Sequence, residues 1–91
     1  MNLLKIFDWT PVAVKAPRPR YEKYDSVSDR LLMGYVVEIE YRYHGRRDVF
    51  FPSVYDYRSF EENNRRALRK AILFYKNAKN KITVQRKKEQ R

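Results

Sequence analysis

The sequence predicts an α+β fold, in which a small antiparallel sheet of three or four strands carries one C-terminal amphipathic helix on one face. A central hairpin, about residues 31–53, combines β-branched and aromatic runs with a turn signal in the middle. A capped helix, about residues 59–79, follows with apolar side chains at helical spacing. The chain has 91 residues, which suits a single domain over residues 1–80 and a basic, flexible tail over residues 81–91.

The N-terminal third is expected to form short strands and a loop. Residues 1–7 predict a short strand, because their apolar side chains can be divided between two faces. The run Val12–Val14 is a candidate for a second short strand. Pro17 and Pro19 then remove backbone N–H donors, so residues 16–29 are expected to form a loop.

The central hairpin is expected to turn at His44-Gly45, because glycine tolerates the positive φ that a two-residue turn requires. Such a turn would place Tyr41 opposite Asp48 and Ile39 opposite Phe50. The core face of this register comprises Tyr35, Val37, Ile39, Tyr41, Tyr43 and Phe50. The opposite face comprises Val36, Glu38, Glu40, Arg42, Arg47, Val49 and Phe51.

The helix is expected to begin at Ser59, where the segment Ser59–Glu62 has the form of a capping box with acidic residues in the first turn. Its apolar positions recur at helical spacing and are Phe60, Ala67, Leu68, Ala71, Ile72, Tyr75 and Ala78. We expect the helix to fray over residues 77–81, after which residues 82–84 either add a strand or extend the chain.

The net charge of +10 is concentrated at the C-terminal end. Residues 1–58 hold 10 Lys or Arg against 8 Asp or Glu, whereas residues 59–91 hold 11 against 3. A concentrated positive potential attracts polyanions, so the asymmetry speaks about the partner of this protein and not about its fold.

Little in the sequence indicates catalysis, and we expect neither an enzyme nor a metal or other cofactor. The absence of Cys excludes disulfides, thiolate metal ligands and a cysteine nucleophile. His44 is expected to be an exposed turn residue, without the partner that a general base needs. Glu38 and Glu40 are expected to be surface carboxylates, with Asp48 on the opposite face of the hairpin.

Our first functional hypothesis is a non-catalytic protein that binds DNA or RNA through phosphate contacts from the helix and the tail. The predicted nucleic-acid-binding residues are Arg65, Arg66, Arg69, Lys70, Lys76, Lys79, Arg86, Lys87 and Lys88, with Lys81 and Arg91 extending the basic surface. The aromatic residues of the hairpin would form a stacking platform for single strands only if the helix left them uncovered. We expect the helix to cover them, and we expect Glu38 and Glu40 on the other face to repel phosphate.

The alternative is a small interaction protein, of viral or mobile-element type, that docks on an acidic surface of a larger protein such as nucleic-acid machinery and inhibits it. Tyrosine is a frequent anchor at such interfaces. The candidate anchors are Tyr21, Tyr24, Tyr55 and Tyr57. A further option is attachment of the tail to anionic membranes. No apolar run approaches the length of a transmembrane segment, and the composition favours a cytoplasmic protein, or a nuclear one in a eukaryotic host.

Overall fold

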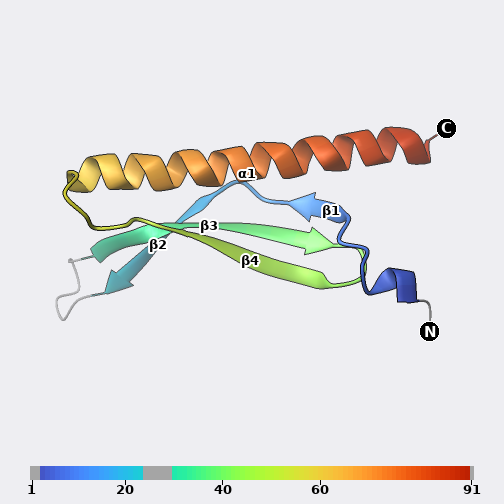
Figure 1. Ribbon diagram of the computed structural model, residues 1–91, viewed down its shortest axis with the longest axis horizontal. Coiled ribbons are helices and arrows are strands. Elements are labelled where there is room, and N and C mark those ends of the chain that lie inside the picture. The colour runs from blue at the N-terminus through green and yellow to red at the C-terminus, as the bar shows by residue number, and fades with distance from the viewer. Residues whose placement is uncertain (1–2, 24–29, 91) are drawn as a thin grey trace.

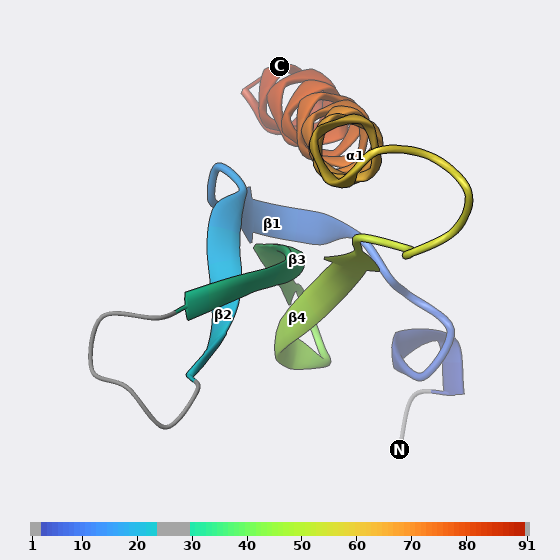
Figure 2. The ribbon, with the colours of Figure 1, turned by 90° about the vertical axis from the view of Figure 1, so that its left-hand side faces the viewer.

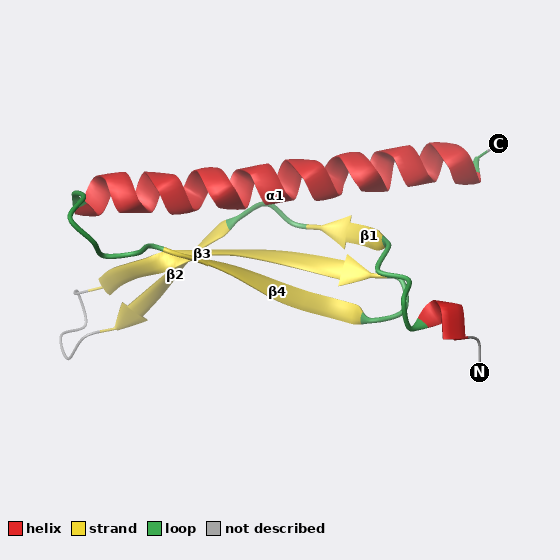
Figure 3. Ribbon diagram, viewed as in Figure 1, coloured by secondary structure: helices red, strands yellow, loops and turns green. Residues whose placement is uncertain are grey.

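Four β-strands and one long α-helix make up the computed structural model, which describes residues 3–23 and 30–90 (Figure 1). In chain order, the elements are the 3₁₀ helix η1 (Leu3–Lys5), β1 (Pro11–Val14), β2 (Arg18–Lys23), β3 (Arg30–Tyr41), β4 (Gly45–Pro52) and α1 (Phe60–Glu89). The strands pair antiparallel, and α1 runs along one face of the sheet (Figure 3). The predicted α+β class, a small antiparallel sheet with a C-terminal helix, is confirmed.

The sheet is built around β3, whose 12 residues make it the longest strand. β4 pairs with one edge of β3 from Gly34 to Tyr41. β1 and β2 pair one after the other with different parts of β3, near its end and near its beginning respectively. Between them the backbone N–H of Lys15 donates to the carbonyl of Glu38 at 2.9 Å. β1 and β2 therefore behave as two halves of one interrupted strand.

The strand predicted at residues 1–7 is wrong for its described part. Leu3–Lys5 form η1, in which the N–H of Ile6 donates to the carbonyl of Leu3 at 3.2 Å. Both edges of β3 are occupied, by β1 and β2 on one side and by β4 on the other, and the described residues of the N-terminal segment pair with no strand. Without a partner strand, its apolar side chains stay largely open to solvent, as Phe7 shows with 77% exposure. The strand predicted at Val12–Val14 is confirmed by β1.

The loop predicted over residues 16–29 is also wrong in part, because residues 18–23 form β2. Pro19 pairs with Tyr35 inside this strand. A proline is tolerated at the rim of a sheet, where its missing N–H takes no hydrogen bond away from a further strand. Residues 24–29, which include Tyr24, lie outside the described residues.

The hairpin forms where the sequence predicts it, but in another register. Its loop has three residues between Tyr41 and Gly45, which pair with each other, and Gly45 adopts the positive φ of 70°. Three-residue loops commonly end in such a left-handed glycine. Ile39 consequently pairs with Arg47 instead of Phe50, a shift of three residues. A shift by an odd number of residues exchanges the two faces of β4 relative to β3. Phe50, predicted on the core face, therefore lies on the opposite face, whereas Val49 and Phe51 lie on the core face.

Helix α1 begins as predicted, with the hydroxyl of Ser59 accepting a hydrogen bond from the N–H of Glu62 at 3.2 Å. Near this start, the hydroxyl of Ser53 donates to the side-chain carbonyl of Asn64 at 2.6 Å and so ties the end of the sheet to the helix. The core lies between α1 and the sheet. Its buried apolar residues are Val37, Ile39, Ala67, Ala71, Ala78 and Ile82. Val36 is also buried, but it pairs with Phe50 on the side of the sheet that faces away from α1.

Small alanines dominate the buried side of α1, so the helix backbone can lie close to the larger side chains of β3. The ring of Phe74 adds a contact to Phe51, with the ring centroids 5.6 Å apart. This contact identifies the helix-facing side of the sheet as the one that carries Phe51, Val37 and Ile39, and leaves the opposite side without a covering helix (Figure 2).

The helix does not end near residue 79 but continues to Glu89, so residues 82–84 form no strand, and most of the segment expected to be a flexible tail is helical. The last turns of α1 are held by contacts with the sheet and the hairpin loop. Ile82 is buried on the sheet, and the carboxylate of Glu89 lies 2.5 Å from the guanidinium of Arg42 in the hairpin loop. Apolar burial and this contact both depend on parts of the chain far away in sequence.

Candidate functional site

The exposed side of α1 carries an unbroken excess of positive charge. Between residues 63 and 88 the helix contains no acidic residue, because Glu61, Glu62 and Glu89 stand at its two ends. We call the basic side chains of α1 the basic helix face, and all ten are exposed. They are Arg65, Arg66, Arg69, Lys70, Lys76, Lys79, Lys81, Arg86, Lys87 and Lys88.

Four residues of the basic helix face form a ridge on the side opposite the buried Ala71. At about 100° per residue they project within a sector of roughly 40°. The ridge residues are Arg65, Arg69, Lys76 and Lys87. At a rise of 1.5 Å per residue, the ridge is about 33 Å long. The remaining six basic residues flank this ridge on both sides, so the positive charge surrounds the solvent side of the helix along most of its length.

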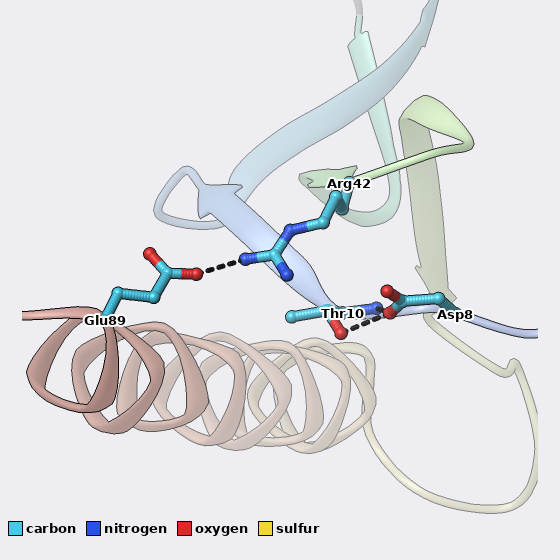
Figure 4. A network of polar contacts seen from close by, with 4 residues as sticks. All are labelled: Asp8, Thr10, Arg42 and Glu89. Carbon is cyan, nitrogen blue, oxygen red and sulfur yellow. Dashed lines mark hydrogen bonds and ion pairs between the residues drawn. The ribbon is translucent and has the colours of Figure 1, made fainter. Parts of the chain in front are cut away.

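The charges of the basic helix face are not neutralised within the described part of the chain. Five ion pairs occur among the described residues, and all their cations belong to the sheet and its loops. Even Glu89, an acidic residue of α1, is directed to Arg42 of the hairpin loop (Figure 4). The closest aromatic contact on this face is that of Lys79, whose ammonium lies 5.6 Å from the ring centre of Tyr75.

Two carboxylates of the sheet, Glu38 and Asp48, have basic neighbours. The carboxylate of Glu38 lies 3.0 Å from the ammonium of Lys15 and 3.4 Å from the guanidinium of Arg46. Only 12% of the Glu38 side chain is exposed. The hydrogen bond from Lys15, together with the positive charges nearby, lowers the pKa of Glu38. Asp48 lies directly opposite Glu38 in the strand pairing, not on the other face as predicted, and faces Arg18 at 3.8 Å. Among the described residues, no three potential ligands gather around a metal site.

His44 is not the exposed turn residue that the sequence predicts. Its ring stacks on Trp9, with the centroids 3.6 Å apart and the planes 6° from parallel, and His44 is half-buried. The guanidinium of Arg47 lies 5.6 Å from the Trp9 ring centre. Next to Trp9, the N–H of Thr10 donates to Asp8 at 3.0 Å, and the Thr10 hydroxyl also donates to this carboxylate and lowers its pKa (Figure 4).

The predicted tyrosine anchors do not all share one surface. Tyr21 of β2 pairs with Leu32, and the hydroxyl of Tyr55 donates to the carbonyl of Leu32 at 2.7 Å, so these two approach the same point. Tyr57 in the β4–α1 loop is 88% exposed, with the guanidinium of Arg58 4.7 Å from its ring centre.

Comparisons with known proteins add no relative to this picture, because no protein-family profile, curated protein or solved structure is significantly similar to the chain. Within the described residues, α1 is long enough to cross a bilayer but too polar, and it is the only helix of that length.

Proposed function

We propose that this protein binds nucleic acid non-catalytically, through phosphate contacts made by the basic helix face. The supporting observation is the set of ten exposed basic side chains without an ion-pair partner among the described residues and without an intervening acid from residue 63 to residue 88. A nucleic acid carries a dense row of phosphates with condensed counterions, and cations that replace these counterions gain affinity by their release.

The helical form of the C-terminal segment affects how such contacts are made. A flexible tail would have to be ordered on binding, whereas side chains on a helix are held in fixed order along one axis. The ridge of about 33 Å is close to the length of one turn of B-DNA, about 34 Å. Phosphate contacts from Arg and Lys position a protein on nucleic acid but carry no sequence information. We therefore expect little preference for base sequence.

The experiment compares two triple variants that remove the same charge. Arg65→Gln/Arg69→Gln/Lys76→Gln neutralises the ridge, and Lys5→Gln/Lys15→Gln/Arg47→Gln neutralises three residues away from the helix. Fluorescence anisotropy with a labelled 20-base-pair duplex is the measurement. We expect the ridge variant to bind roughly a hundredfold more weakly at 0.1 M salt, and the control variant to stay within a few-fold of wild type.

Equal losses in the two variants would show a response to net charge alone and would contradict the assignment to the helix. If the wild-type protein fails to bind either duplex or single-stranded nucleic acid even at low salt, the proposed function is wrong.

A second candidate function is docking on an acidic protein surface, which the pair of Tyr57 and Arg58 favours. Tyrosine and arginine are among the residue types most often found as interface anchors, and Tyr57 is almost fully exposed. Recovery of one partner protein after nuclease treatment, lost in a Tyr57→Ala variant, would support this candidate over nucleic-acid binding.

A further inference from the structure

The side of the sheet that faces away from α1 carries an aromatic and basic surface. The corrected hairpin register brings Phe50 to this side, where 39% of the residue is exposed. Phe50 lines a shallow groove of about 470 Å³ together with Tyr21, Arg18 and Arg20. Figure 2 shows that the helix lies on one side of the sheet only, so no helix of the described chain covers this groove.

Each aromatic ring of the groove has an arginine beside it. The guanidinium of Arg20 lies 5.2 Å from the ring centre of Phe50, and that of Arg30 lies 6.0 Å from the ring centre of Tyr21. The edge of the Phe50 ring lies over Gly34, where a Cβ would come within 2.9 Å of it. Both rings and their arginines are in place in the chain without a ligand, and a surface that is already arranged lowers the entropic cost of binding.

Two acidic residues of this side have basic neighbours, whereas Glu40, further along β3, is exposed and forms no ion pair among the described residues. Glu38 is largely covered between Lys15 and Arg46, and Asp48 faces Arg18 at 3.8 Å. Arg20 and Arg30 remain without an ion-pair partner among the described residues. The local balance next to Phe50 and Tyr21 is therefore positive.

We propose that this groove binds a single-stranded segment of nucleic acid, with unpaired bases stacked on Phe50 and Tyr21 and phosphates contacted by Arg20 and Arg30. Exposed aromatic rings beside basic residues on an open sheet suit unpaired bases, because every base presents a flat face and the strand between the bases is anionic. A duplex keeps its bases stacked internally and would use only the basic helix face. This inference rests on the proposed function and adds a preference for single strands.

The experiment uses the full chain, a labelled 12-nucleotide pyrimidine strand and a labelled hairpin duplex with the same number of phosphates. Phe50→Ala is compared with Tyr57→Ala, a matched control because Tyr57 is an exposed aromatic residue that also has an arginine beside its ring. We expect Phe50→Ala to weaken binding of the single strand on the order of tenfold, with duplex binding unchanged. Tyr57→Ala should leave both affinities within a factor of two.

A further variant keeps the test independent of folding. Phe50→Leu preserves an apolar side chain next to Gly34 but removes the aromatic face, so it should show the same selective loss while keeping the wild-type melting temperature. Arg20→Gln should weaken single-strand binding less than Phe50→Ala does, since it removes one phosphate contact and no stacking surface.

The possible failures are distinguishable. If Phe50→Ala and Phe50→Leu bind the single strand as wild type does, or lose duplex and single-strand affinity equally, the stacking groove is contradicted, while salt-dependent duplex binding would leave the proposed function standing. If the wild-type protein binds neither nucleic acid, both proposals fall.

Discussion

The basic residues of α1 and those of the sheet are arranged in opposite ways. On the sheet, Lys15, Arg18 and Arg46 lie against Glu38 and Asp48, so that much of their charge is balanced inside the protein. On α1, ten exposed cations have no such partner among the described residues. Ion pairs between strands help to hold the strands together, whereas unpaired cations can contact another molecule. The difference teaches that the location of a lysine or arginine, and not its presence, indicates its role.

Charge reversal on the ridge of α1 should separate binding from folding most strongly. We expect Arg65→Glu/Arg69→Glu/Lys76→Glu to reduce duplex affinity by roughly a thousandfold or more, because three attractive contacts become repulsive. Its free energy of unfolding should change by less than about 1 kcal/mol, since surface substitutions away from contacts have small effects. Anisotropy and urea denaturation of the same samples measure both quantities. A large loss of stability in this variant would mean that the ridge has a structural role.

Removal of the fully buried side chain of the sheet should do the reverse. Val37 has no exposed surface, and we expect Val37→Ala to lower the free energy of unfolding by about 2 kcal/mol, because it leaves a cavity under α1. Leu73→Ala is the control, since Leu73 of α1 is 61% exposed and its replacement should cost less than about 0.5 kcal/mol. Urea denaturation would contradict the described core if the two variants were equally destabilised.

The sequence predicts the elements of this fold better than their partners. Ser59 marks the helix start, and the β-branched run marks β3, because capping and alternation are local signals. The register depends on a three-residue loop in place of the expected two-residue turn, and this single difference moves Phe50 from the predicted core to the open side.

The predicted end of the helix was also wrong because it depends on contacts between residues far apart in the sequence. The extension of α1 to Glu89 depends on burial of Ile82 and on Arg42, 47 residues earlier in the chain. The candidate site was predictable in part, since helical spacing places the basic residues on the exposed side of α1. The lack of acidic partners for these residues was not predictable, because ion pairs join segments that are distant in the sequence. Glu38, for example, pairs with Lys15 and not with a residue of α1.

The free energy of unfolding at acid pH tests the ion pairs of Glu38. The hydrogen bond from Lys15 and the nearby cations lower the pKa of Glu38 from its usual 4.5. A carboxyl with a lower pKa in the folded chain stabilises the fold above pH 4.5, and this contribution is lost as the pH falls through the folded-state pKa. We expect wild type to lose stability below pH 4.5 more steeply than Glu38→Gln. Glu40→Gln, which changes an exposed carboxylate of the same strand, should follow the wild-type profile in urea denaturation at each pH.

The contact between the helix end and the hairpin loop should have the smallest effect. Arg42 and Glu89 form an exposed ion pair, and such pairs contribute about 0–1 kcal/mol. We expect Glu89→Gln to leave the melting temperature nearly unchanged but to speed amide hydrogen exchange in the last two turns of α1. Unchanged exchange in these turns would show that burial of Ile82 alone holds the helix end.

The salt dependence of duplex binding tests the central claim most directly. If the unpaired cations of α1 contact phosphates, a plot of log K against log salt should be steep for wild type, with a slope of about −4 or steeper, and shallower by about 3 for Arg65→Gln/Arg69→Gln/Lys76→Gln. Lys5→Gln/Lys15→Gln/Arg47→Gln should keep the wild-type slope. A flat wild-type plot, or a ridge variant with the wild-type slope, would contradict the account.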